Sequence, residues 1–131
     1  MARVVHFEIH AEDPERASAF YTSVFGWEIL RWNGPQEYWL ITTGTSDTPG
    51  IDGAIMRRKA GKPKEGQPVN GFVNTVDVED IEDAVGRVIE NGGKVIVSKK
   101  PVSGVGWVVY CKDTEENIFS LMEQDPSVGT A

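Results

Sequence analysis

The stretch VVHFEIHAEDPERASAFYTSVFG, residues 4–26, decides the fold. Its first part alternates between an apolar and a polar face, which is typical of a strand that covers a core on one side. The two faces are Val5, Phe7 and Ile9 against His6, Glu8 and His10. Asp13 followed by Pro14 is typical of a helix N-terminus, and Gly26 of a helix C-terminus. The stretch therefore predicts a strand followed by a helix.

The predicted helix carries an apolar stripe that we expect to cover one face of a sheet. The stripe consists of Ala17, Phe20, Tyr21, Val24 and Phe25. Three strand candidates follow it, and turns rich in glycine and proline separate them. These candidates are Trp27–Trp32, Glu37–Thr43 and Ile51–Arg58.

The same order of elements then returns. Gly71–Val78 is predicted to be a strand, a helix is expected to begin after Asp80, and Gly92-Gly93 is expected to end it. Three more strand candidates follow: Lys94–Ser98, Gly106–Lys112 and Ile118–Glu123.

Single residues repeat along with the elements. Asp13, Glu15, Ala17 and Gly26 are matched, 67 positions on, by Asp80, Glu82, Ala84 and Gly93. We therefore expect an α+β protein of two tandem βαβββ modules whose curled mixed sheets enclose a cavity. Module one is predicted at about 4–58, an exposed linker at 59–69 and module two at about 70–124, all within one domain spanning 1–131.

The composition excludes several classes of partner. The chain has 131 residues and a formal net charge of -7, so its surface repels nucleic acid and anionic membranes. No apolar run approaches the roughly 20 residues that span a bilayer, and no signal-peptide pattern is present. The single cysteine cannot form an intramolecular disulfide. We expect a cytoplasmic protein.

The chain resembles the vicinal oxygen chelate superfamily, which contains glyoxalase I, bleomycin-resistance proteins and extradiol dioxygenases. The resemblance covers about residues 4–124 and implies a glyoxalase-like fold and a homodimer. It does not fix one reaction, because members catalyse isomerisation, dioxygenation, epimerisation or thiol transfer, and some only bind. The stretches that carry it are 5–9, 13–17 with Phe20-Tyr21, 25–27, 53–56, 91–93, 104–107 and 113–119.

The resemblance also implies four metal-ligand positions, one on the first and one on the last strand of each module. Carried over to this chain, they fall on His6, Met56, Gly71 and Ser120. Only His6 binds a divalent ion well, and one imidazole does not hold zinc, nickel or iron. We therefore expect no metal and no other cofactor. The alternative is a substitute site built from His6, Glu8 and His10.

The polar face of the first strand holds the candidate catalytic groups. His6 is expected to contact a ligand or to transfer a proton, and Glu8 is a candidate general base. The alternative for His6 is a hydrogen-bonded wall residue, with His10 at an exposed strand end. For Glu8 it is a wet cavity or a pairing with Arg57, Arg58 or a ligand cation.

Further residues are expected to bind the ligand. Some are aromatic, since flat apolar ligands favour aromatic walls; others are placed near the cavity by the resemblance. This set is His10, Tyr38, Trp39, Met56, Thr75, Trp107 and Ser120.

Three functions follow from these observations. The first is a metal-independent superfamily protein that binds a small organic molecule between its sheets and uses His6 or Glu8 in acid–base catalysis. The second is a metal-dependent lyase or dioxygenase with substitute ligands. The third is a non-catalytic protein that sequesters its ligand, as bleomycin-resistance proteins do. The sequence leaves open whether the chain is an enzyme, a lyase or isomerase for example.

Overall fold

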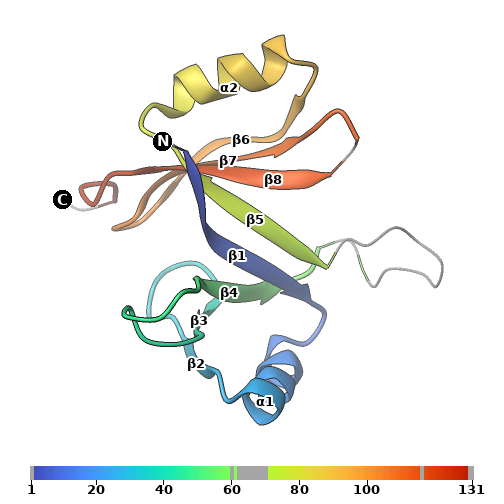
Figure 1. Cartoon of the computed structure of the whole chain (residues 1–131), viewed down its shortest axis with the longest axis vertical. Helices are drawn as coiled ribbons and strands as arrows, with labels where there is room; N and C mark the ends of the chain where they lie inside the picture. The colour runs from blue at the N-terminus through green and yellow to red at the C-terminus, as the bar shows by residue number, and fades with distance from the viewer. Residues whose placement is uncertain (1, 60, 62–70, 116, 130–131) are drawn as a thin grey trace. The chain divides into compact units, whose positions relative to one another are not determined.

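The computed structural model describes residues 2–59, 61, 71–115 and 117–129. Within these residues the chain forms two helices and eight strands (Figure 1). Their bounds are β1 Arg3–Ala11, α1 Pro14–Phe25, β2 Glu28–Arg31, β3 Tyr38–Thr42, β4 Asp52–Arg57, β5 Phe72–Asp77, α2 Ile81–Glu90, β6 Lys94–Val102, β7 Gly106–Lys112 and β8 Ile118–Gln124. Most of the linker expected at 59–69 lies outside the described residues.

The chain divides into two compact units. The N-terminal unit comprises residues 6–72, and its strands lie in the order β2-β3-β4-β1. The C-terminal unit comprises residues 1–5 and 73–131, and its strands lie in the order β5-β8-β7-β6. In each unit the first and last strands of the repeat pair in parallel, and the other pairs described are antiparallel. The α+β class and the repeated βαβββ order are thus confirmed; the cavity stays a prediction.

Both helices begin and end where the sequence signals predict. The carboxylate of Asp13 accepts a hydrogen bond from the backbone N of Arg16 at 3.1 Å, and Asp80 caps α2 through the backbone N of Glu82. Gly26 adopts a left-handed conformation with φ of 73°, which glycine adopts without a steric cost. The caps therefore fix where each helix leaves its preceding strand.

Strand β6 is longer than the sequence predicts. The expected end was Ser98, before two lysines and a proline, but the strand continues to Val102. Pro101 pairs with Trp107 of β7, and β6 is the last strand in the order of the C-terminal unit. An edge strand tolerates proline and lysine because one side of its backbone needs no partner in the sheet.

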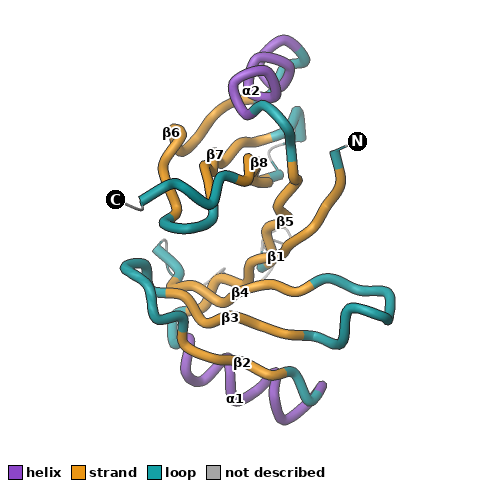
Figure 2. Tube along the Cα trace, turned by 90° about the vertical axis from the view of Figure 1, so that its left-hand side faces the viewer, coloured by secondary structure: helices purple, strands orange, loops and turns teal. Residues whose placement is uncertain are grey.

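Each unit has its own core on the helix side of its sheet, and Figure 2 shows α2 along β6, β7 and β8. In the N-terminal unit the helix α1 covers less than its stripe suggests. Ala17 and Tyr21 pack against the core, but Phe20, Val24 and Phe25 are 57%, 54% and 59% exposed. The expected stripe is therefore only partly buried. The core of this unit consists of Phe7, Ile9, Ala11, Trp39, Ile41 and Ile55.

Gly53 determines how closely β4 approaches β1. A Cβ atom at this position would lie 2.5 Å from the backbone O of Phe7 and 2.8 Å from its ring. We expect Gly53→Ala to lower the free energy of unfolding by about 1–3 kcal/mol, since it overpacks this contact.

Gly86 provides the matched control, because a Cβ there meets nothing within 4 Å. Gly86→Ala in α2 is expected to raise stability by about 0.5–1 kcal/mol. Urea unfolding followed by circular dichroism measures both, and equal effects of the two substitutions would contradict this account of Gly53.

Candidate functional site

The polar side chains of β1 lie on one face of the N-terminal unit's sheet. Strand alternation sends Phe7 and Ile9 into the core beside α1, and places their neighbours on the opposite face. We call this opposite face the polar face. Its residues are His6, Glu8 and His10 of β1, Asp52, Ala54 and Met56 of β4, and Tyr38 and Leu40 of β3.

Glu8 is the central group of the polar face. Its residue is only 4% exposed, although glutamate is rarely buried without compensation. Its Oε1 lies 3.3 Å from Nε2 of His10, which is itself part-buried and not at an exposed strand end. The arginines that were candidate partners make other contacts: Nε of Arg57 lies 2.8 Å from Oε1 of Glu37, and Arg58 donates to the carbonyl O of His10 at 2.7 Å.

The surroundings of Glu8 change how its neighbours titrate. Burial lowers the pKa of His6 below its usual value, and the charges of Glu8 and Asp52 oppose this shift. Burial and the charge of Glu8 raise the pKa of Tyr38 to about 12. At neutral pH the site therefore offers a neutral imidazole that can accept a proton and a phenol that can donate a hydrogen bond.

Two of the carried-over metal positions, Met56 and Gly71, do not lie beside His6. The β1–β4 register places His6 opposite Asp52, whereas Met56 lies opposite His10. The carbonyl O of Gly71 also lies beside His10, accepting a hydrogen bond from its backbone N at 3.4 Å. Met56 is thus four residues along the sheet from His6, which is about 13 Å. The carry-over was wrong in register for this pair.

No cluster of three His, Cys, Asp or Glu side chains that could hold a metal ion occurs within residues 2–59, 61, 71–115 and 117–129. Asp52, the carboxylate level with His6, is already used: its Oδ1 accepts a hydrogen bond from the backbone N of Thr43 at 2.9 Å. The polar face therefore offers the imidazoles of His6 and His10 and the buried carboxylate of Glu8 for acid–base chemistry more readily than a preformed ligand set.

In the C-terminal unit the structure brings Thr75 and Ser120 together. They face each other in the β5–β8 register, their hydroxyl oxygens are 2.7 Å apart, and both residues are buried. Tyr110 lies opposite Ser120 in the neighbouring pair of strands and joins them on the face away from α2. The sequence reasoning did not select Tyr110, because it placed Trp107 at the ligand, and alternation from Trp107 sends Tyr110 to the other face.

The two tryptophans of the candidate set lie on the helix sides of their sheets. Trp39 belongs to the core beside α1, where its Nε1 donates to Glu15 at 3.0 Å. Trp107 packs against the core beside α2, and the ammonium of Lys99 lies 4.9 Å from its ring centre. Neither shares a face with the polar residues of its unit. The cause is strand alternation. Trp39 is one residue from Tyr38 and Trp107 is three residues from Tyr110, so each tryptophan points to the opposite face of its sheet.

Parts of this chain match a known protein family and a known enzyme. Residues 3–44 match the family described as bleomycin resistance protein-like N-terminal. The lactoylglutathione lyase of Salmonella typhimurium is 24% identical over 124 residues, which cover 92% of both chains.

Solved structures of other proteins are similar to this chain in fold. A glyoxalase/bleomycin resistance protein/dioxygenase superfamily member from Vibrio splendidus matches with a TM-score of 0.63 and 19% identity, covering 95% of this chain and 100% of that one. This chain has the vicinal oxygen chelate fold. The methylmalonyl-CoA epimerase of Mycobacterium tuberculosis shares it, with a TM-score of 0.66, 13% identity, and coverage of 95% of this chain and 89% of the other.

Neither described helix is long and apolar enough to cross a membrane.

The electrostatic account of the polar face predicts that the titration midpoint of His6 is lowered. The chain has only two histidines, so His10→Gln assigns their ring resonances. We expect His6 to titrate below 6.5, since burial disfavours its charged form. Glu8→Gln should lower the His6 midpoint further, because it removes a charge that favours the imidazolium.

The measurement is a proton–carbon NMR titration of the imidazole rings. Glu90→Gln, an exposed position in α2, removes a carboxylate of the other unit and should leave the His6 midpoint unchanged. A His6 midpoint that does not respond to Glu8→Gln would show that the two groups are not neighbours.

Proposed function

We propose that the chain binds a small organic molecule on the polar face and transfers a proton to and from it without a metal ion. The observation that carries this proposal is Glu8, a carboxylate 4% exposed on the strand face turned away from the core. Placing a charged group there costs folding free energy, and functional sites are where such costs recur.

His6, Glu8 and Tyr38 have different roles in the proposed proton transfer. Neutral His6 accepts a proton from an acidic carbon onto a ring nitrogen and then returns it. The negative charge of Glu8 stabilises the imidazolium that forms in between, as its effect on the His6 pKa implies. Tyr38, which keeps its proton at neutral pH, donates a hydrogen bond to a ligand oxygen. Leu40 and Met56 supply apolar contact on the same face.

The similar proteins support proton transfer on this fold without fixing the substrate. One is named an epimerase and another a lyase, so enzymes occur among the relatives. Their thioesters, methylmalonyl-CoA and S-lactoylglutathione, are suitable first test compounds for this chain. The identities of 13% and 24% do not carry a substrate over by themselves.

Sequestration without catalysis is the second candidate function. The family match over residues 3–44, described as bleomycin resistance protein-like, favours it. In that case the polar face holds a ligand through Glu8 and Tyr38, and His6 only lines the wall. Binding without turnover that survives His6→Ala would support this alternative.

Proton transfer predicts exchange with solvent. In heavy water, we expect the protein to incorporate deuterium at the acidic carbon of an accepted thioester, followed by proton NMR. Both His6→Gln and Glu8→Gln should slow this exchange by about a hundredfold or more. Glu37→Gln, an exposed carboxylate in the same unit, is the matched control and should leave the rate unchanged.

The exchange rate should also depend on pH in one direction. His6 acts as a base only when neutral, and its pKa lies below 6.5. The value of kcat/KM should therefore be constant near pH 7 and fall as the pH drops below the His6 pKa. A rate that rises in acid would contradict the assignment of His6 as the base.

Metal removal separates this proposal from the metal-dependent lyase or dioxygenase. Dialysis against a chelator should leave ligand binding and exchange unchanged, because the proposed steps use only side chains. Elemental analysis of the purified protein provides the second readout. Stoichiometric divalent metal, with activity lost on chelation and restored by the ion, would overturn the proposal.

We also propose that the chain forms a homodimer. Val24 and Phe25 on α1 are 54% and 59% exposed, and exposed apolar side chains on one helix are a typical surface for protein contacts. Light scattering coupled to size exclusion measures the mass directly. A mass of one chain at micromolar concentration would contradict this proposal.

A further inference from the structure

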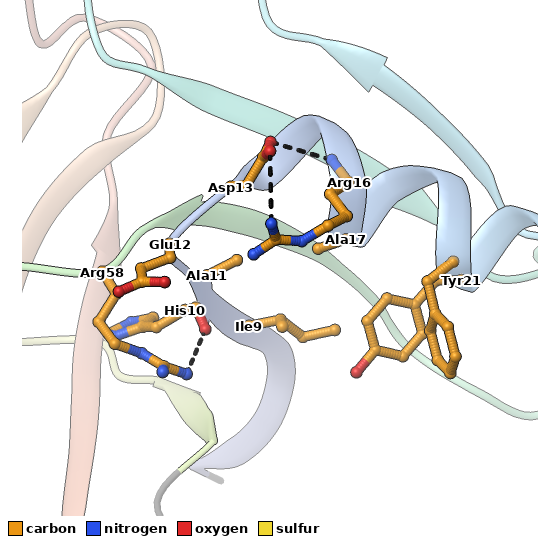
Figure 3. A pocket seen from close by; sticks show the side chains of 10 residues that line it. Ile9, His10, Ala11, Glu12, Asp13, Arg16, Ala17, Tyr21 and Arg58 are labelled. Carbon is orange, nitrogen blue, oxygen red and sulfur yellow. Dashed lines mark hydrogen bonds and ion pairs between the residues drawn. The ribbon is translucent and has the colours of Figure 1, made fainter. Parts of the chain in front are cut away.

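A pocket lies in the N-terminal unit, on the side of β1 that faces α1 (Figure 3). Its volume is about 580 Å³, which is in the range of pockets that hold small organic ligands. It is therefore on the opposite side of the strand from the side chain of Glu8.

The pocket has an apolar and a charged end. Ile9 and Ala17 lie along its middle and Tyr21 closes the end away from Arg58 (Figure 3). Phe20, which also lines the pocket, is 57% exposed and adds an aromatic surface at the helix. A flat apolar body would contact these four side chains and bury surface that α1 otherwise leaves to solvent.

Arg58 provides the charge at the other end. One of its terminal nitrogens, Nη2, donates to the carbonyl O of His10 at 2.7 Å, which holds the guanidinium at the pocket. In the described part of the chain no carboxylate forms an ion pair with it within 4 Å. The fork of an arginine presents several donors, so one carbonyl leaves others for an anion.

Acidic groups at the rim limit the charge of the ligand. Arg16 also lines the pocket, but its Nη1 lies 3.9 Å from Oδ2 of Asp13, which offsets part of its charge. Glu12 is a further carboxylate of the lining. One negative charge on a ligand is matched by Arg58, whereas a second would meet Glu12 and Asp13.

We propose that this pocket binds an organic monoanion: a carboxylate held by Arg58 and Arg16, with a flat apolar body against Ile9, Ala17, Phe20 and Tyr21. The site is separate from the polar face and does not depend on the proposed function. His10 of β1 lines this pocket, and its side chain contacts Glu8 of the polar face. The two sites therefore share strand β1.

Isothermal titration calorimetry with 2-naphthoate tests the proposal, with 2-naphthamide as its neutral analogue. We expect the wild-type protein to bind naphthoate at least about tenfold more tightly than the amide, since a charge-assisted pair adds to the apolar contact. Naphthalene-2,6-dicarboxylate, a dianion of similar shape, should bind more weakly than naphthoate.

Variants locate the site. Arg58→Gln should weaken naphthoate binding about tenfold, Arg58→Lys should keep most of it, and Arg16→Gln should weaken it by less than Arg58→Gln. Arg87→Gln is the matched control, because Arg87 is an exposed arginine of α2 in the other unit and should not matter.

Several results would overturn the proposal. They are equal affinity for naphthoate and naphthamide, unchanged affinity in both Arg58→Gln and Arg16→Gln, and no naphthoate binding at millimolar concentration. Loss of binding in Arg87→Gln as well would have the same consequence, because it would indicate a general attraction of anions.

Discussion

Strand β1 has to satisfy two environments at once, and the N-terminal unit depends on this constraint. Phe7, Ile9 and Ala11 form the core with α1, while the residues between them occupy the polar face. A shift of one residue in the β1–β4 register would put Glu8 into the core and Phe7 on the polar face. The register therefore fixes the chemistry as well as the stability.

Close packing reinforces that register. Gly53 lies opposite Phe7, and the absence of a side chain there lets the ring and the backbone of β1 approach β4. The electrostatics of the polar face depend on burial as well. Removing water from His6 and Tyr38 favours their neutral forms, which lowers the pKa of His6 and raises that of Tyr38.

The sequence predicted the elements well because their signals are local. Alternation in β1, the caps at Asp13 and Asp80, and the glycine after α1 each depend on neighbouring residues alone. The pairing of strands was harder. Met56 was matched to His6 by resemblance, but it lies opposite His10, and nothing in the local pattern fixes which residues face each other.

The candidate site was likewise predictable only where the signal is local. His6, Glu8 and His10 were placed together by alternation, and the structure puts them on one face with Tyr38, which was chosen as an aromatic residue. Trp39 was chosen as an aromatic residue although alternation from Tyr38 sends it to the core. The pocket at Arg58 could not be predicted from the sequence, because the chain brings that side chain back to His10 only 48 positions later.

This return of the chain has a consequence for how the protein folds. The parallel pairs β1–β4 and β5–β8 join the first and last strands of each repeat, so Thr75 reaches Ser120 only across 45 positions. Closing such a loop costs chain entropy before any contact repays it, whereas the antiparallel pairs between neighbouring strands are local. Hairpins such as β7–β8 should therefore form early, and the parallel strands should join last, as the slow step that makes each repeat cooperative.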